Sequence, residues 1–354
     1  MSTAGEAPDR VGAFRALVAD RQGEVFAAQV RELGAADLPD GDTVVRVAFS
    51  DLNYKDALAV ADKGRILQRL PLVPGIDLVG AVVESATGQH AVGDSVLING
   101  YGIGEGHWGG YTQLTRVRSD WLVPVPAGLT AWQAAAIGTA GYTAMLSVMA
   151  LEDHGVAPGD GPVAVTGASG GVGSYAVALL AKAGYEVVAS TGRPRTAPYL
   201  RRLGATDVIG REVLEEASKR PMGSERWAGA VDAVGGATLA GLIATTRRHG
   251  SIAACGLAGG HGLETTVFPF ILRGVSLLGI DSNFCLHERR EEAWDRLAKD
   301  LTPETIELIA PHTVALGELP ELSIRLLAGD VEGRVVVDLG AESRPRHDQG
   351  DEDV

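Results

Sequence analysis

A glycine-rich loop carries the clearest chemical signal in this chain of 354 residues. It reads Gly167-Ala-Ser-Gly-Gly-Val-Gly173 and lies between an apolar strand-like run and an apolar helix-like run. Glycines let the backbone approach a pyrophosphate closely, and the first turn of a following helix offers unpaired N–H groups and a positive dipole end. The spacing is a G-x-x-G-x-x-G variant of the dinucleotide fingerprint. In strand–loop–helix order it predicts dinucleotide binding rather than a structural turn.

The end of the next strand indicates which dinucleotide is bound. An NAD enzyme places Asp or Glu here, where the carboxylate holds the ribose 2′-hydroxyl. This strand ends Ser190-Thr-Gly-Arg193-Pro-Arg195, with no acid and two arginines. Guanidinium groups form charge-assisted, often bidentate bonds with phosphate, so the pattern favours NADPH over NADH. The alternative, that these arginines are merely solvated at a helix start, suits Arg201 and Arg202 better than Arg193.

Later strand ends should face the same cofactor, because ligands of parallel sheets lie outside the carboxyl ends of the strands. These ends are the segments 234–236, 255–260 and 280–283, where small residues leave room for ribose and nicotinamide. Taken singly, ordinary turn chemistry explains each of these small residues equally well.

Two kinds of pattern must position this loop. Residues 13–130 read as short strands separated by Gly and Pro, which predicts a β-rich, barrel-like domain. From about residue 140, helical stretches alternate with apolar strand runs, as in a doubly wound parallel sheet. A charged amphipathic helix is expected at 288–301, and 313–340 returns to strand, helix and strand. The expected parallel strands are 162–166, 186–190, 230–234, 251–255 and 275–280.

Composition narrows the possible functions. The formal net charge is −14, from 31 Lys+Arg against 45 Asp+Glu, whereas a general nucleic-acid binder needs a basic surface. The first residues lack the pattern of a secretory signal. The uncharged stretch 121–151 holds Pro and Gly, which favour a loop and a buried helix over a membrane span. We therefore expect neither a nucleic acid nor a membrane as partner, and the low cysteine count fits the cytoplasm.

Both ends of the chain hold few apolar residues. Such segments cannot offset the entropy of ordering, so we expect residues 1–12 and 341–354 to be disordered. The C-terminal tail is acidic and is expected to be solvated; a partner-binding role is the alternative.

Several longer motifs resemble one superfamily, the medium-chain dehydrogenases/reductases. They are the segments 74–80, 92–96 and 107–111 and the glycine loop, and the order of β-rich domain, nucleotide domain and return segment is similar too. A narrower resemblance, over residues 14–340, is to the acryloyl-CoA reductase group, often labelled putative quinone oxidoreductases. It rests on Leu52-Asn-Tyr-Lys-Asp56, on the stretches 100–110 and 138–145, on Cys255-Gly-Leu-Ala-Gly-Gly260 and on Pro269-Phe-Ile-Leu-Arg273.

The resemblance implies an α/β fold, a cofactor and an assembly. It implies a GroES-like catalytic domain of residues 13–138 and 283–340 and a Rossmann NADPH-binding domain of residues 139–282. Members of the group are described as NADPH-dependent, zinc-free and commonly homodimeric, and the apolar strand 275–280 is a candidate edge for pairing two copies. Arg334 either touches the cofactor or braces the strand after it. The expected cofactor contacts are Tyr54, Thr143, Ser169, Gly170, Gly171, Val172, Gly173, Ser174, Thr191, Gly192, Arg193, Arg195, Arg211, Gly256, Leu257, Ser282 and Arg334.

The residues that bind zinc in other members of the superfamily have no counterpart in this sequence. Those members place Cys, then Gly-His-Glu, then Cys, Asp or Glu around the metal. Here the matching segment reads Pro74-Gly-Ile-Asp77, and no cysteine precedes Cys255. Two cysteines, Cys255 and Cys285, cannot form a four-cysteine site. We expect no metal, since no ligand-like spacing joins His90, His107, His154 and His261.

A nicotinamide enzyme without a metal can reduce an electron-poor alkene by conjugate hydride transfer. The β-carbon receives hydride, charge develops on the carbonyl oxygen, and the protein supplies hydrogen-bond donors to that oxygen and a proton to the α-carbon. The resemblance puts the segment 53–56 at the cleft, where Asn53 could bond the nicotinamide ribose or carboxamide and Tyr54 offers a phenolic donor. Lys55 offers a cation, and Asp56 could position Lys55 or Tyr54. The alternative is a surface turn that begins a helix.

The resemblance therefore implies NADPH-dependent reduction of acryloyl-CoA to propanoyl-CoA. A CoA substrate needs cations for its phosphates, and the candidates are Lys63, Arg65 and Arg69, with Arg289 and Arg290 as a second group. Solvated surface charge explains either group equally well. Two further hypotheses stay open: a reductase of quinones or small enones, which needs no phosphate-binding cations, and a non-catalytic NADPH-binding protein, which needs no donor at position 54.

Overall fold

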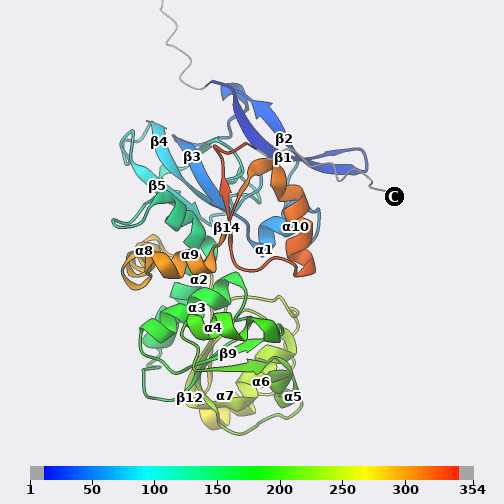
Figure 1. The fold of residues 1–354 in the computed structure, drawn as a ribbon, viewed down its shortest axis with the longest axis vertical. Helices are drawn as coiled ribbons and strands as arrows, with labels where there is room; N and C mark the ends of the chain where they lie inside the picture. The colour runs from blue at the N-terminus through cyan, green and yellow to red at the C-terminus, as the bar shows by residue number, and fades with distance from the viewer. Residues whose placement is uncertain (1–11, 343–354) are drawn as a thin grey trace, which may run out of the picture.

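The computed structural model describes residues 12–342, which form two lobes stacked along the long axis of the molecule (Figure 1). Of the ends expected to be disordered, 1–12 and 341–354, residues 1–11 and 343–354 lie outside the described residues. The guanidinium of Arg15 donates a hydrogen bond to the carbonyl of Ala341. Both ends of the described chain therefore meet on the same lobe.

The β-rich lobe is built on a seven-stranded sheet with the order β14-β15-β3-β4-β5-β7, and β6 joins it through β3. β3 is central and runs antiparallel to β15, β4 and β6. Alternating valines, such as Val45 and Val47, bury one face of β3. The strands are β1 (Phe14–Gln22) and β2 (Val25–Leu33), which form a separate hairpin, then β3 (Thr43–Asp51), β4 (Asp77–Ser85), β5 (Ser95–Asn99), β6 (Leu114–Val117), β7 (Val123–Pro124), β14 (His312–Ala315) and β15 (Val335–Asp338).

The second lobe, called here the nucleotide lobe, holds six parallel strands in the order β10-β9-β8-β11-β12-β13, which confirms the doubly wound sheet. After β8 the chain adds β9 and β10 on one side of that strand, and it then returns to add β11, β12 and β13 on the other side. The switch point of the sheet therefore lies between β8 and β11. The expected strand 230–234 was misplaced: it ends at Asp232, because that carboxylate accepts from the N–H of Gly235 and turns the chain. The strands are β8 (Val163–Val165), β9 (Val187–Thr191), β10 (Asp207–Gly210), β11 (Trp227–Asp232), β12 (Thr246–Ala254) and β13 (Ser276–Gly279).

Helices cover both faces of this parallel sheet, as buried parallel strands require. All three residues of β8 are completely inaccessible to solvent, and α3 packs over them. The helices of this lobe are α3 (Gly171–Lys182), α4 (Ala197–Arg202), α5 (Glu212–Ala217), α6 (Gly236–Thr245) and α7 (Phe268–Arg273).

One long apolar helix, α2 (Ala131–Asp153), runs between the lobes. By length and composition alone this helix could cross a membrane, but 89% of its apolar 18-residue stretch is buried inside the protein. This is the loop and buried helix expected at 121–151. α2 contacts β3 and β4 of one lobe and α3, β11 and β12 of the other. It is interrupted at Gly138, whose φ of 47° and ψ of −158° are not helical.

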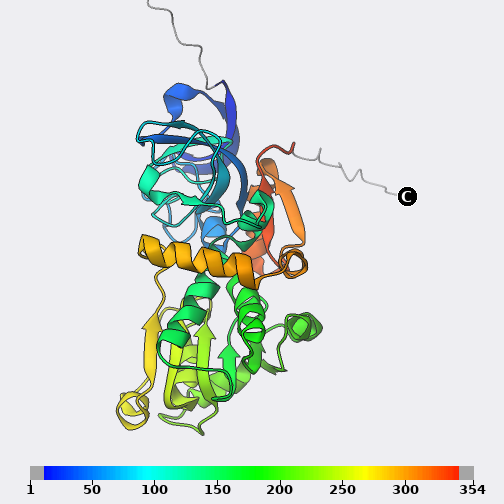
Figure 2. The same ribbon diagram turned by 90° about the vertical axis from the view of Figure 1, so that its left-hand side faces the viewer.

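The chain returns to the β-rich lobe through helices that pack on α2. α8 (His287–Asp300) lies across the junction of the lobes (Figure 2), and α9 (Pro303–Ile309) contacts α2 and α3. The predicted amphipathic helix and the strand–helix–strand pattern at the C-terminal end are confirmed by α8, β14, α10 (Leu319–Ala328) and β15. α10 packs against α1 (Tyr54–Val60), the helix that carries the candidate catalytic segment.

Candidate active site

A cavity of about 460 Å³ lies between the glycine loop and the β-rich lobe, and is called here the interlobe cavity. One wall consists of the loops after β8, β9 and β11, beside the switch point where a doubly wound sheet binds its ligand. The other wall is formed by the start of α1 and the segment before β15. The predicted site residues that line it are Asn53, Tyr54, Ser169, Gly170, Gly171, Val172, Gly173, Thr191, Gly192, Arg193, Arg211 and Arg334.

The glycine loop is shaped for close approach of a ligand. Gly167 has φ 57°, a left-handed conformation that favours glycine, and Gly170 is the N-cap of α3. A Cβ on Gly173 would lie 2.3 Å from the carbonyl oxygen of Gly167, so a side chain there would push the loop away from the helix. The unpaired N–H groups of the first turn of α3 therefore stay beside the cavity, where they suit a pyrophosphate.

The cavity end near β9 carries two cations and an unpaired hydroxyl. Ser190 is 1% exposed, lines the cavity, and its Oγ has no hydrogen-bond partner within residues 12–342. Arg193 lines the cavity and donates through Nη2 to the carbonyl of Ser169 at 3.1 Å. Arg211 lies over Gly192, its Nε 2.9 Å from where a Cβ would stand. A buried, unpaired hydroxyl and two guanidinium groups that line the same cavity fit the 2′-phosphate of NADPH.

Several predicted cofactor contacts lie elsewhere. Arg195 pairs with Glu332, its Nε 2.9 Å from Oε1, and lines a different cavity. Ser174 turns inward, because its Oγ donates to the carbonyl of Ala168 at 3.2 Å. Thr143 is buried in the second half of α2, and its hydroxyl has no partner in the described part of the chain. None of these three side chains lines the interlobe cavity.

The cofactor contacts predicted in the loop after β12 and in the segment after β13 also lie outside the cavity wall. Gly256 packs against the backbone of Ala233, so close that a Cβ would lie 2.4 Å from its oxygen. Leu257 is 64% exposed. The carbonyl of Ser282 accepts a hydrogen bond from Arg290 at 3.4 Å. From this loop, Ala258 and Gly259 line the cavity instead.

The candidate catalytic segment begins α1. Asn53 is the N-cap, and its backbone N–H donates to Asp56 Oδ2 at 3.0 Å, one half of a capping box. Tyr54 is 52% exposed and lines the cavity. Lys55 pairs with Glu105 at 2.5 Å, and Asp56 is buried under the helix start. The expectation that Asp56 positions Lys55 or Tyr54 was wrong, because its carboxylate is used to cap α1.

The Asn53 amide is surrounded by charged groups. Its Oδ1 accepts from Arg334 Nη1 at 2.8 Å. Its Nδ2 lies 2.6 Å from Asp51, 2.8 Å from Asp77 and 3.0 Å from Asp56. An amide nitrogen has two N–H donors, so it cannot serve three carboxylates at once. Asp51, Asp56 and Asp77 are called here the carboxyl cluster, and they lie directly behind the cavity wall formed by Asn53 and Arg334.

Burial controls the charge of this cluster. Its three carboxyl groups are at most 1% exposed, and Arg334 is 4% exposed. Burial, reinforced by the charge of Asp77, raises the pKa of Asp56 to about 7. Burial also raises the pKa of Asp51 well above its ordinary value, against the attraction of Arg334. The cluster therefore retains protons near neutral pH, because three buried carboxylates cannot all stay ionised around one guanidinium.

Asp77 connects the cluster to the break in α2. Its carboxylate accepts from the backbone N–H of Thr139 at 2.9 Å and from the Thr139 hydroxyl at 2.6 Å. It therefore serves as an N-cap for the second half of α2, which begins after Gly138. Asp51 and Asp77 were missed in the sequence. The available signal was an acidic residue in an otherwise apolar strand, because such a residue needs buried partners.

The predicted CoA-binding cations do not line the interlobe cavity. Lys63, Arg65 and Arg69 are exposed on the segment between α1 and β4. Arg69 lines a separate cavity of about 550 Å³, together with Trp108. This segment stays close to α1, since the Gln68 N–H donates to the carbonyl of Glu105, the partner of Lys55.

The second group of candidate cations, Arg289 and Arg290, makes contacts within the protein, and Arg289 pairs with Asp153 and Glu292. Arg290 is fully buried, with its guanidinium 4.4 Å from the ring of Tyr101 and 4.8 Å from the ring of Tyr142. It also donates to the carbonyl of Asn99 at 2.5 Å. Arg290 is thus inaccessible to a substrate phosphate, and the suggestion that it binds CoA was wrong.

The described residues hold neither a metal-binding cluster nor an activated thiol. Within residues 12–342, no group of three or more His, Cys, Asp or Glu side chains is arranged to hold a metal ion. Burial raises the pKa of the Cys255 thiol to about 12, and the thiol donates to the carbonyl of Asp232. Cys255 is therefore a protonated, structural thiol rather than a nucleophile.

Both lobes match models of known protein families. Residues 39–127 match the alcohol dehydrogenase GroES-like domain, and residues 171–299 match the model described as zinc-binding dehydrogenase. The matched ranges correspond to the β-rich lobe and to the nucleotide lobe with α8.

Three relatives are similar over nearly their whole length. The acrylyl-CoA reductase AcuI of Ruegeria pomeroyi is 53% identical, over 93% of this chain and 100% of its own. The crystal structure of Escherichia coli YhdH with bound NADPH is 49% identical with a TM-score of 0.89, over 92% and 100% of the two chains. The putative quinone oxidoreductase YhfP of Bacillus subtilis is 44% identical over 92% of this chain and 99% of its own, and its structure with NAD bound has a TM-score of 0.89.

Proposed function

Because the chain belongs to the zinc-free, acrylyl-CoA reductase group of the medium-chain dehydrogenase/reductase superfamily, we propose that it reduces acryloyl-CoA to propanoyl-CoA with NADPH. The supporting observation is near full-length identity of 53% with an acrylyl-CoA reductase. The site agrees with this: a phosphate-binding loop forms one wall of the cavity, and Asn53 and Tyr54 form the other.

NADPH supplies the hydride for the β-carbon of the substrate. The chain's own residues hold and orient it: the start of α3 binds the pyrophosphate, and Arg193, Arg211 and Ser190 bind the 2′-phosphate. Asn53 is fixed by its bond to Arg334 and offers the remaining lone pair of Oδ1 to the cavity. This fixed acceptor orients the nicotinamide half of the cofactor toward the substrate.

Tyr54 has the chemistry needed at the thioester oxygen. Negative charge develops on that oxygen during hydride transfer, and a donor placed there stabilises the transition state. The Tyr54 phenol is a donor in the cavity wall, and its 52% exposure leaves it open to an entering substrate. In this proposal Tyr54 donates a hydrogen bond to the developing enolate oxygen, and a water molecule at the open side delivers the proton to the α-carbon.

The experiment is an assay of NADPH oxidation with purified protein, comparing acryloyl-CoA with a simple quinone and repeating each with NADH. The expected result is fast turnover with acryloyl-CoA and NADPH. Turnover with the quinone alone would replace this proposal by the second one below. No oxidation of bound NADPH by either acceptor would favour a non-catalytic NADPH-binding protein.

A quinone or small enone is the second candidate acceptor, favoured by the name of the 44% identical relative from Bacillus subtilis. The two acceptors differ in their phosphates, so the exposed cations Lys63, Arg65 and Arg69 discriminate between them. A triple Gln variant should lose activity with acryloyl-CoA and keep any activity with a quinone if these cations bind CoA.

We propose further that the protein is a cytoplasmic homodimer joined through the edge of the nucleotide lobe. β13 is an edge strand of its sheet, and the nearby α7 exposes Phe268, Ile271 and Leu272, each by more than 45%. Apolar side chains beside an unpaired strand favour burial against a second copy. Both cysteines are free, as a reducing compartment requires. A monomer in light scattering at assay concentration would end the dimer proposal.

A further inference from the structure

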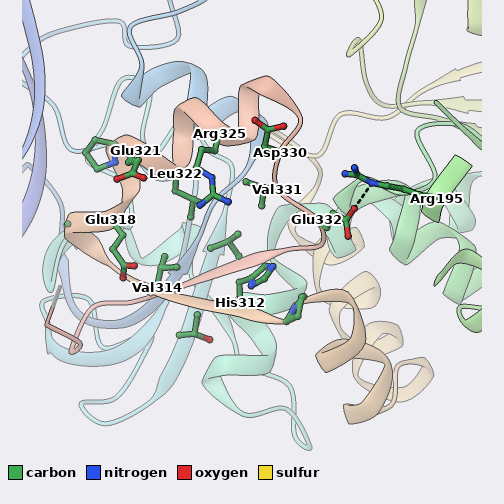
Figure 3. A pocket seen from close by; sticks show the side chains of 15 residues that line it. Arg195, His312, Val314, Glu318, Glu321, Leu322, Arg325, Asp330, Val331 and Glu332 are labelled. Atoms are coloured by element: carbon green, nitrogen blue, oxygen red, sulfur yellow. Dashed lines mark hydrogen bonds and ion pairs between the residues drawn. The ribbon is translucent and has the colours of Figure 1, made fainter. Parts of the chain in front are cut away.

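Two arginines of the nucleotide lobe hold the same loop of the β-rich lobe, residues 329–333. Arg195 Nε donates to Glu332 Oε1 at 2.9 Å. Arg193 Nη1 makes a longer contact, 3.5 Å, with the carbonyl of Val331. Figure 3 shows Arg195 reaching from the nucleotide lobe to Glu332. The loop is therefore hydrogen-bonded to the nucleotide lobe at Val331 and at Glu332.

This loop separates two cavities. Gly329, Val331 and Gly333 line the interlobe cavity. Val331 also lines a larger cavity of about 990 Å³, together with Glu332, between α10, β14 and the loop (Figure 3). Glu332 thus lies one residue from the wall of the interlobe cavity, at the side where Arg193 meets the loop. An acidic side chain therefore stands next to the end that suits the 2′-phosphate.

We propose that Glu332 limits the preference for NADPH over NADH by competing with the 2′-phosphate for Arg195. In the free protein the Glu332 carboxylate neutralises this guanidinium. When NADPH binds, Arg195 leaves Glu332 and turns to the 2′-phosphate beside Arg193. The inference rests on the NADPH-dependent function proposed above and adds a residue that lies outside the cofactor cavity.

The energetics permit this exchange. The Arg195 and Glu332 side chains are 68% and 58% exposed, and ion pairs of this kind contribute little to stability. A phosphate monoester carries between one and two negative charges and three acceptor oxygens, so it is a stronger partner for arginine than a carboxylate. NADH offers a hydroxyl instead, which cannot displace Glu332. The carboxylate therefore weakens binding of NADPH and leaves binding of NADH unchanged.

The test is a titration of the full-length protein with NADPH and with NADH, followed by nucleotide fluorescence. Glu332→Gln should lower the Kd for NADPH about 3- to 5-fold, the range set by an exposed ion pair, and change the Kd for NADH less than twofold. Arg195→Gln should raise the Kd for NADPH, and in that background Glu332→Gln should have no effect. Glu321→Gln is the matched control, since Glu321 lines the same large cavity without contacting Arg195.

Three results would overturn the inference: no change in the Kd for NADPH on Glu332→Gln, an equal change for NADH, or the same gain on Glu321→Gln. Adenosine 2′,5′-bisphosphate, which keeps the 2′-phosphate and lacks the nicotinamide, should show the same gain as NADPH. If the unmodified protein binds NADH as tightly as NADPH, the NADPH-dependent function itself fails, and the two failures are thereby distinguished.

Discussion

The two ends of the interlobe cavity are built in opposite ways. At the phosphate end, the glycine loop and the two arginines come from one stretch of chain, 167–211, and the arginines are accessible to solvent. At the other end, Asn53 is held by Arg334 and by the carboxyl cluster, which are buried, and two of these partners, Asp77 and Arg334, come from distant segments. The first end recognises a charged ligand through exposed cations, whereas the second holds the Asn53 side chain in place with buried charged groups behind it.

This difference has an energetic consequence. Exposed charges are screened by water and salt, so changing one of them alters stability little. Buried charges carry a large desolvation cost, which is offset only while every partner is present. Variants at the carboxyl-cluster end should therefore affect folding, and variants at the phosphate end should affect binding.

Replacing the buried cation Arg334 should have the largest effect on stability. Arg334→Met leaves Asp51 without the guanidinium that lies 2.5 Å from it, and it should cost about 3–5 kcal/mol of stability, as for other broken buried pairs. Urea unfolding at neutral pH measures the loss. Arg195→Met, which breaks an exposed pair, should cost less than about 1 kcal/mol. Adding Asp51→Asn to Arg334→Met should recover part of the lost stability, because it removes the unpaired buried carboxylate. Equally small losses for Arg334→Met and Arg195→Met would show that the buried ion pair contributes no more to stability than the exposed one.

The carboxyl cluster should also make stability depend on pH. The folded pKa of Asp56, about 7, is above the ordinary aspartate pKa of about 3.9, so between these values the folded state binds more protons than the unfolded state. Stability is then full below about pH 4 and falls as pH rises through 7, by up to about 4 kcal/mol for this group. Asp51 shifts in the same direction.

Asp56→Asn removes one titrating group and should flatten this fall. The measurement is the urea midpoint between pH 4 and pH 8, compared with the unmodified protein. Asp120→Asn is the control, because the hydrogen bond from Arg118 lowers the pKa of Asp120 and places its titration below this window. An unchanged slope in Asp56→Asn would show that Asp56 is ionised throughout.

At the phosphate end, the substitution expected to weaken NADPH binding most is one that displaces the backbone of the glycine loop. Gly173→Ala places a Cβ 2.3 Å from the carbonyl oxygen of Gly167, so the loop must shift away from the ligand. We expect the Kd for NADPH to rise about 100-fold, equivalent to about 3 kcal/mol, while urea unfolding changes much less. Gly262→Ala is the control, since a Cβ there meets no atom within 4 Å. An unchanged Kd in Gly173→Ala would remove this loop from the cofactor site.

The contrast between the two ends also explains what could be predicted from the sequence. The glycine loop, the strand before it and Arg193 are neighbours in the chain, so local spacing was enough to place them at the cavity. Asp51, Asp77 and Thr139 meet only because β3, β4 and the break in α2 come together in the fold. Local pattern also could not predict the ion pair between Arg195 and Glu332, because 137 residues separate the two partners.

The smallest expected effect is that of replacing Tyr54. Tyr54 is in the cavity wall yet half exposed, so Tyr54→Phe should change neither folding nor NADPH affinity appreciably. If its hydroxyl donates only to the developing enolate, kcat with acryloyl-CoA should fall about 10-fold while KM stays nearly constant. Tyr101→Phe is the control, because the Tyr101 hydroxyl contacts His287 and lies outside the cavity wall. An unchanged kcat in Tyr54→Phe would take Tyr54 out of the mechanism and leave Asn53 as the catalytic-segment side chain that faces the substrate.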